Sequence, residues 1–225
     1  MAAPLLAPLD IDGIVITADA LLTQREFARH LVEDRKAHYH FTVKGNQKTL
    51  LDDLQYYFQH NSAKSPDASE TNHGHGRIET RKIWVTTRLN EHLDFPYVAQ
   101  AFAIKREVIN KKTGEITREI AYGVTSQSEY DAKAIDVLRT NRNHWCIENS
   151  CHYILDWNYD EDRCRIRSQY GPENISRIRR FAIGVIKAIS AKGVAETMRN
   201  LTMNVRLVFD YLKMTKNTLG RCDFS

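Results

Sequence analysis

The sequence predicts an α/β fold in which a small parallel unit is followed by antiparallel strands and then by helices. Three observations lead to this prediction. Residues 11–59 alternate short β-branched runs with amphipathic segments, residues 77–125 hold three strand-like runs, and helical periodicity dominates from residue 130 onward. Of the 225 residues, 42% are hydrophobic, which is enough for a packed core.

The first part of the chain has the order strand, helix, strand, helix. Residues 11–18 (IDGIVITA) and 38–43 (HYHFTV) are short, apolar and rich in β-branched or aromatic side chains, so both are expected to be strands. Residues 23–35 and 47–59 carry apolar residues at helical spacing, and Thr23 is the expected N-cap of the first helix. This order predicts that the two strands pair in parallel through a right-handed crossover.

The middle of the chain has a different residue pattern. Residues 60–76 are polar and are expected to form a loop. Strands are then predicted at 77–87, 97–109 and 116–125, with residues 110–114 as a hairpin loop that ends in glycine. The middle is therefore predicted to be an antiparallel insertion.

The last third is predicted to be helical. A helix near 130–140 leads into one at 142–156, another begins after Gly171-Pro172, and a final one covers 193–213. The helix after the Gly-Pro pair has an apolar stripe made of Ile175, Ile178, Ala182, Val185, Ile186 and Ile189.

The net charge of +4 is unevenly distributed. Residues 139–225 carry 15 basic and 9 acidic side chains, whereas residues 1–138 carry 17 and 19. A basic C-terminal third fits a polyanionic partner such as DNA, and its alternative is a basic but merely solvated helical surface. No apolar run is long enough for a membrane span, and four cysteines without a C-x-x-C pair predict reduced thiols in the cytoplasm.

Two acidic residues are candidate ligands. Asp19 directly follows the first predicted strand, where ligands of open α/β sheets commonly lie; alternatively it caps the turn before Thr23. Glu148 lies at the edge of the apolar face of its predicted helix and is either a ligand or a salt-bridged structural residue. With His144 and His152 it forms a stripe of zinc-ligand types, but positions eight residues apart on a helix are separated by about 12 Å.

Several basic residues are candidate phosphate contacts. The first cluster occupies alternate positions of the chain and comprises Arg163, Arg165 and Arg167. The second lies on one side of the helix after residue 172 and comprises Arg177, Arg180 and Lys187. Lys44 ends the second predicted strand. Arg142 is expected at the start of a helix, where a cation is electrostatically unfavourable. Such side chains contact phosphates without reading sequence, and solvated surface residues are the alternative for all of them.

Five motifs occur in an order that resembles a known family. They are TADALLTQ around Asp19, TVKGNQ at 42–47, HGRIETR at 75–81, HWCIEN at 144–149 and LDWNYDED at 155–162. The chain is similar over essentially its whole length to the H-repeat-associated family of bacterial insertion-sequence transposases, which belong to the DDE group.

The resemblance implies an RNase H-like fold in which two aspartates and one glutamate hold Mg²⁺ or Mn²⁺. Asp19 and Glu148 match the second aspartate and the glutamate. It implies DNA as the partner, both element ends and target, and a homo-oligomer acting on it. The domain then comprises residues 1–215, with a β insertion at 77–125, a helical part at 130–213 and a tail at 216–225.

The sequence departs from the family pattern in two ways. The first aspartate belongs on a strand upstream of this sequence, so we expect an N-terminally truncated chain that is catalytically impaired alone. The Y-x₂-R-x₃-E-x₆-K signature of related transposases keeps only its glutamate, because the other positions hold Asn141, His144 and Leu155. The alternatives are a non-catalytic DNA-binding or dimerisation remnant and an unrelated hydrolase that uses the His144–Glu148–His152 stripe.

Overall fold

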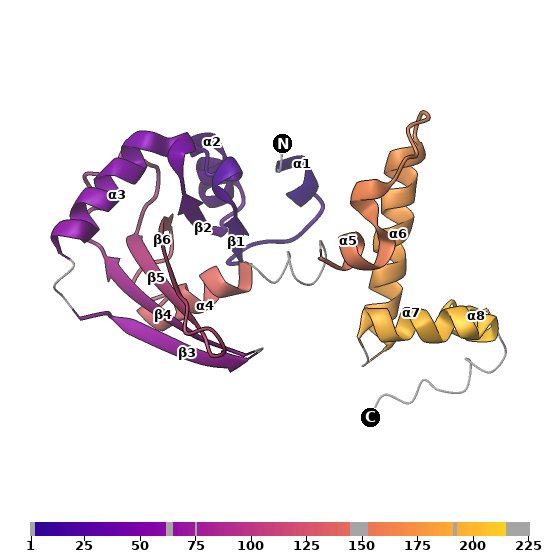
Figure 1. The fold of residues 1–225 in the computed structure, drawn as a ribbon. Helices are drawn as coiled ribbons and strands as arrows, with labels where there is room; N and C mark the ends of the chain where they lie inside the picture. Colours follow the sequence, from indigo (N-terminus) through magenta and orange to yellow (C-terminus); the bar gives the residue numbers. More distant parts are fainter. Residues whose placement is uncertain (1–2, 62–64, 75, 145–152, 191–192, 215–225) are drawn as a thin grey trace, which may run out of the picture. The chain divides into compact units, whose positions relative to one another are not determined.

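The computed structural model divides the chain into two compact units, residues 1–144 and 145–225, which are described separately (Figure 1). It describes residues 3–61, 65–74, 76–144, 153–190 and 193–214.

The first unit is built on a six-stranded mixed sheet with the order β1-β2-β6-β5-β4-β3. Its strands are β1 Val15–Ala18, β2 His38–Val43, β3 Ala68–Gly74, β4 Arg77–Thr86, β5 Gln100–Asn110 and β6 Ile116–Thr125. Its helices are α1 Ala3–Leu6, α2 Arg25–Arg29, α3 Lys48–His60 and α4 Ala134–His144. Only β1 and β2 pair in parallel, and every other neighbouring pair is antiparallel. The predicted α/β class and the parallel pairing are confirmed.

Each face of this sheet packs against different helices, because successive side chains of a strand point to opposite faces. On one face, here called the α3 face, Tyr39 and Phe41 of β2 are fully buried together with Leu54 of α3. On the other, the α4 face, Phe102 is buried in a smaller cluster with Leu138 of α4. Figure 1 shows α3 and α4 lying on opposite sides of the strands.

The predicted boundaries are most accurate for the central strands. The structure confirms β2 and β6 at the predicted residues, 38–43 and 116–125. The loop predicted at 60–76 is wrong, because residues 68–74 form β3, paired with β4 along its length. β3 lies at the edge of the sheet and is mostly exposed. Its polar residues pair with β4 through backbone hydrogen bonds, so the strand lacks the alternation of apolar and polar residues by which a half-buried strand is recognised in a sequence.

The predicted N-cap at Thr23 is also wrong. Gln24 precedes α2, and no side chain caps that helix end. Thr23 is instead fully buried, and its hydroxyl donates to the Thr42 carbonyl of β2 at 2.9 Å. The segment after β1 is therefore tied to β2. The predicted helix 23–35 continues past α2 as a turn of π-helix, His30–Asp34.

The second unit is helical, as predicted. It contains α5 Tyr153–Tyr159, α6 Gly171–Ile189, α7 Val194–Met203 and α8 Val205–Tyr211, so the single helix expected at 193–213 is broken at Asn204. The stripe predicted for α6 is only partly right. Ile186 is buried, but Ile178 and Ile189 are 61% and 50% exposed, because the packed side of the helix is centred nearer Ile183.

Gly123 of β6 is required by close packing rather than by a turn. A Cβ atom at this position would lie 2.2 Å from the Phe102 ring and 2.5 Å from the Phe41 carbonyl oxygen. We expect Gly123→Ala to lower the free energy of unfolding by about 3 kcal/mol, because the ring and the neighbouring strand would both have to move. Urea denaturation measures this change. Gly45→Ala is the control, since nothing lies within 4 Å of its added carbon; an equal loss in both variants would contradict the packing argument.

Candidate functional site

Asp19 lies where β1 ends. It directly follows Ala18, has an extended backbone and is exposed. Its Oδ1 accepts a hydrogen bond from the Leu21 amide at 3.1 Å and so caps the 3₁₀ turn Ala20–Leu22. The capping role considered for this aspartate is thus present, and it uses one carboxylate oxygen. Oδ2 makes no hydrogen bond to the described residues, so this oxygen remains available to a ligand.

The turn that carries Asp19 is fixed by residues that follow β2. The side-chain amide of Asn46 donates to the Ala20 carbonyl, and that of Gln47 donates to the Thr23 carbonyl at 3.0 Å. Because β1 and β2 are parallel, both strands end at the same edge of the sheet. Exposed Lys44 follows β2 at this edge. Neither Asn46 nor Gln47 was predicted to be a site residue, although both belong to the TVKGNQ motif.

The end of α4 is attached to the same two strands on the α4 face. His144 Nδ1 lies 3.1 Å from Thr17 Oγ1, and Asn141 Nδ2 lies 3.5 Å from His40 Nε2. Thr17 and Asp19 are two residues apart along extended backbone, so their side chains lie on the same side. The carboxyl end of α4 is therefore next to the strand that carries Asp19.

His40 is a neutral member of this contact. Its ring is stacked on Phe102 with centroids 4.6 Å apart, and its side chain is almost completely inaccessible. Burial, with a smaller contribution from nearby His144, lowers the pKa of His40 to about 3. Its Nδ1 atom is buried without a partner among the described residues. A neutral imidazole can accept the Asn141 hydrogen bond at Nε2.

Glu148 and His152 lie outside the described residues. The expectation for Arg142 is wrong: it lies in the last turn of α4, not at a helix start, where a cation is favourable. Arg142 and Arg139 both pair with Glu70 of β3, at 3.4 Å and 3.1 Å.

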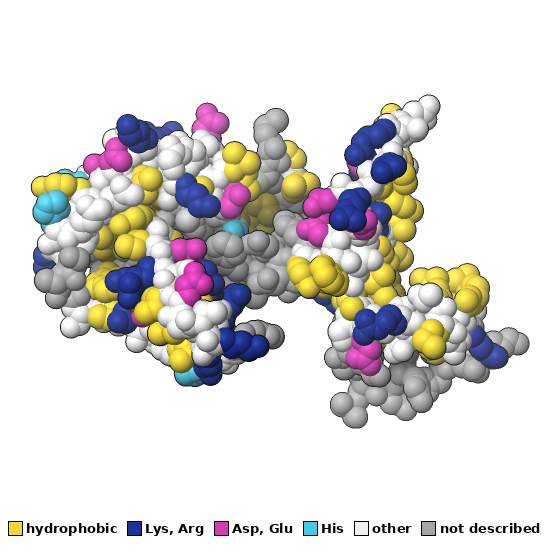
Figure 2. Space-filling view, viewed as in Figure 1, with side chains coloured by type: hydrophobic (Ala, Val, Ile, Leu, Met, Phe, Trp, Pro, Cys, Tyr) yellow, Lys and Arg dark blue, Asp and Glu magenta, His cyan; other side chains and the backbone are white. Residues whose placement is uncertain are grey.

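The other predicted phosphate contacts belong to the second unit, where all are exposed. They are Arg163, Arg165, Arg167, Arg177, Arg180 and Lys187. Arg177 pairs with Glu173 on the same helix, and Arg163 lies 3.7 Å from Asp160. Figure 2 shows Lys and Arg side chains gathered around the α6 end of this unit.

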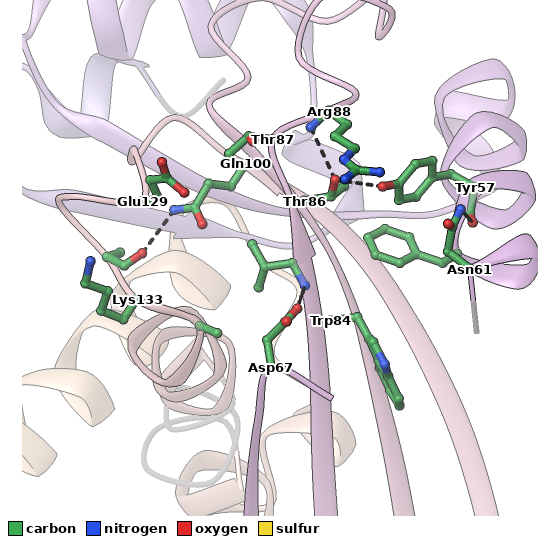
Figure 3. Close-up of a pocket in the computed structure, with 14 residues that line it drawn as sticks. Tyr57, Asn61, Asp67, Trp84, Thr86, Thr87, Arg88, Gln100, Glu129 and Lys133 are labelled. Carbon is green, nitrogen blue, oxygen red and sulfur yellow. Dashed lines mark hydrogen bonds between the residues drawn. The ribbon is translucent and has the colours of Figure 1, made fainter. Parts of the chain in front are cut away.

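A pocket of about 440 Å³ lies at the opposite side of the sheet, beside β4. Four strand spacings, or about 19 Å, separate β4 from β1. Polar groups around the pocket bind one another: Tyr57 and Thr86 share a hydrogen bond, and Asp67 accepts from the Val85 amide (Figure 3). The pocket is therefore separate from the Asp19 site.

Among the described residues, no group of three or more His, Cys, Asp or Glu side chains is placed to hold a metal ion. Asp19 on its own still fits one part of a Mg²⁺ site. Mg²⁺ takes hard oxygen ligands, keeps several waters, and is often held by one or two carboxylates together with substrate phosphates. In the described part of the chain, none of the helices has the length and apolar character needed to cross a bilayer.

Comparison with known proteins identifies the family. The transposase DDE domain family matches residues 1–176, which contain both candidate carboxylates. The chain belongs to this DDE transposase family. Three relatives from Escherichia coli are similar to it. "Putative transposase YncI" of strain O157:H7 is 33% identical over 195 residues, covering 81% of this chain and 48% of YncI.

The other two relatives come from strain K12. "H repeat-associated putative transposase YhhI" and "Putative protein YbfL" are each 30% identical over 214 residues, covering 89% of this chain and 55% of the relative. The resemblance to the H-repeat-associated transposases is thereby confirmed. The chain spans about half the length of these relatives.

Proposed function

We propose that this chain is part of a transposase catalytic domain that cleaves and joins DNA strands by metal-dependent phosphoryl transfer. Family membership supports the reaction class. The observation that supports Asp19 is the attachment of α4 to β1, because His144 contacts Thr17, two residues before Asp19. Glu148 is assigned by its place in the HWCIEN motif.

The fold that best accounts for this arrangement is RNase H-like. In this proposal β1, β2 and α4 belong to the catalytic core of a domain covering residues 1–215, and the antiparallel strands that follow α3 are an insertion. The insertion then begins with β3 at Ala68 rather than at residue 77.

Asp19 and Glu148 would hold Mg²⁺ or Mn²⁺. When bound, such ions activate the attacking oxygen and stabilise the leaving oxygen of an in-line displacement at phosphorus. Other residues of the chain would position the Asp19 carboxylate and provide positive charge for the DNA. Asn46 and Gln47 fix the backbone of the Asp19 turn, and Lys44 is placed at the same sheet edge to contact a DNA phosphate.

The basic residues of the second unit would contact the DNA backbone of element ends or target. This applies to Arg163, Arg165, Arg167, Arg177, Arg180 and Lys187. For Arg142, a phosphate would have to compete with Glu70, its present partner. Transposition joins two element ends to a target, so assembly of a homo-oligomer on DNA is part of the proposal. We also propose that the chain by itself is impaired in cleavage, because the motifs assign it only two carboxylates.

Manganese binding tests the proposal directly. In electron paramagnetic resonance titrations, the purified chain is expected to bind Mn²⁺, and Glu148→Gln is expected to lose most of this binding because it removes a charged oxygen ligand. Asp52→Asn, an exposed change on α3, is the control and should bind normally. Duplex DNA carrying the element's end is added to measure nicking.

Three results would decide against parts of this proposal. If the wild-type chain binds no Mn²⁺, or if Glu148→Gln binds it as tightly, the metal site is wrong. DNA binding without any metal binding would favour the alternative, a non-catalytic DNA-binding or dimerisation remnant. Efficient metal-dependent nicking by the chain alone would contradict the proposed impairment.

A further inference from the structure

The outer halves of β3–β6 extend beyond α3 on one face of the sheet, while on the other face Glu70 still pairs with Arg139 and Arg142 of α4. We call these outer halves, residues 70–74, 76–82 and 105–120, the arm. In β6 the boundary is sharp: residues 116–120 are exposed and residues 122–125 are buried. In β5, residues 100–104 are buried and residues 105–110 are partly exposed. The arm therefore presents two surfaces, one on each face of the sheet.

Two adjacent positions of the arm place like charges directly opposite each other. Arg81 of β4 pairs with Arg106 of β5, and the next residue, Lys82, pairs with Lys105. Like charges in directly opposed positions destabilise a sheet. Because side chains alternate between faces, the arginine pair lies on the α4 face and the lysine pair on the α3 face.

The arginine pair is neutralised within the protein. Glu79 lies between the two guanidinium groups and pairs with both Arg81, at 2.9 Å, and Arg106. Arg106 also pairs with Glu119 at 3.1 Å. The opposed arginines on the α4 face of the arm are thus held in an ion-pair network and need no external anion.

The lysine pair is not balanced in this way. Among the described strand residues on the α3 face of the arm, Glu107 is the only carboxylate, and it already pairs with Arg118 at 2.6 Å. Three cations, Lys82, Lys105 and Arg118, therefore share one anion. The hydrogen bond from Arg118, reinforced by the nearby charges of Lys105 and Lys82, holds the pKa of Glu107 below its usual range.

We propose that the α3 face of the arm binds the phosphate backbone of double-stranded DNA, with Lys82, Lys105 and Arg118 as the contacts. The three residues lie on three neighbouring strands, so their cations span roughly 10 Å across the sheet. Figure 2 shows Lys and Arg side chains gathered toward the hairpin tips of the same strands. The inference rests on the proposed function, which makes DNA the partner.

Phosphate contacts can be counted from the salt dependence of binding. Each phosphate contact to duplex DNA contributes about −0.9 to the slope of log K against log salt concentration. The experiment measures fluorescence anisotropy of a labelled duplex from the element's end over a range of KCl concentrations. Lys82→Gln/Lys105→Gln is expected to reduce the magnitude of this slope by roughly 2 and to weaken binding at least about 10-fold at low salt.

The control is Lys111→Gln/Lys112→Gln, which removes the same charge from the hairpin loop between β5 and β6. It should change the slope less than the strand variant does. Thermal unfolding of the strand variant should be unchanged or higher, because a repulsive pair has been removed. A lower melting temperature would contradict the unbalanced charge on which the inference stands.

The outcomes separate this inference from the proposed function. If the wild-type chain binds DNA but the strand variant has the same slope, the arm does not bind DNA while the transposase proposal stands. Equal losses in the strand and loop variants would show a general charge effect and also overturn the inference. If the wild-type chain binds no DNA at any salt concentration, both proposals fail.

Discussion

Replacing Asp19 by asparagine is expected to weaken Mn²⁺ binding about 100-fold or more while leaving the fold intact. The loss follows from the removal of a charged oxygen ligand at the end of β1. The fold should survive because asparagine caps a helical turn about as well as aspartate does. Its side-chain oxygen can still accept the hydrogen bond from the Leu21 amide, which holds the turn in place.

Calorimetric titration with Mn²⁺ measures this effect, and urea denaturation confirms that the free energy of unfolding is unchanged. Asp12→Asn is the matched control, because Asp12 is an exposed aspartate that precedes the same strand. If Asp19→Asn binds Mn²⁺ like the wild type, Asp19 serves only as a cap. If both variants lose binding equally, the ion is held by general negative charge.

The second large effect concerns His40 and acid stability. Its pKa is about 3 in the folded protein, against 6.5 in the unfolded chain, because burial opposes the charged ring. Between these values unfolding takes up a proton, so the free energy of unfolding falls as the pH drops below 6.5. The contribution of this one residue is about 2 kcal/mol between pH 7.5 and pH 5.

His40→Phe is expected to remove this pH dependence, since phenylalanine keeps a ring against Phe102 but cannot be protonated. Urea denaturation at pH 7.5 and pH 5 gives the difference for each protein. The variant loses the Asn141 contact and is expected to be less stable at pH 7.5, so the change with pH is the informative quantity. His60→Gln, on an exposed histidine, is the control. If the free energy of unfolding of His40→Phe depends on pH as strongly as that of the wild type, His40 is not the source of this pH dependence.

Elements were predicted most accurately where the local residue pattern and the burial of its side chains indicate the same secondary structure. β2 was predicted at its observed residues because its hydrophobic run is bounded by the turn at Lys44 and Gly45. β3 was missed because an exposed edge strand has no apolar alternation. The packed side of α6 was misplaced because Ile178 and Ile189 are apolar yet exposed, and periodicity cannot tell which apolar residues find a partner.

In the candidate site, too, some features could be predicted from the sequence and others could not. Asp19 was predicted from its match to the family motif, because its position after a strand does not by itself distinguish a ligand from a cap. The contacts that organise its surroundings were beyond local reasoning, because His144 and Thr17, or Asn46 and Ala20, are distant in sequence. The related signature has tyrosine and arginine where this chain has Asn141 and His144. The structure uses both of these residues to attach α4 to the first two strands.

The sheet topology also sets the order in which the chain can fold. The Thr125 hydroxyl donates to the Tyr39 carbonyl across 86 residues, and His144 meets Thr17 across 127. Contacts of such long sequence separation form slowly, because loop closure must precede any stabilisation. During synthesis on the ribosome, β2 therefore waits for β6, its second neighbour in the sheet, to emerge at the end of the antiparallel region. Until then its backbone is open to mispairing, and chaperone dependence in the cell is the expected result.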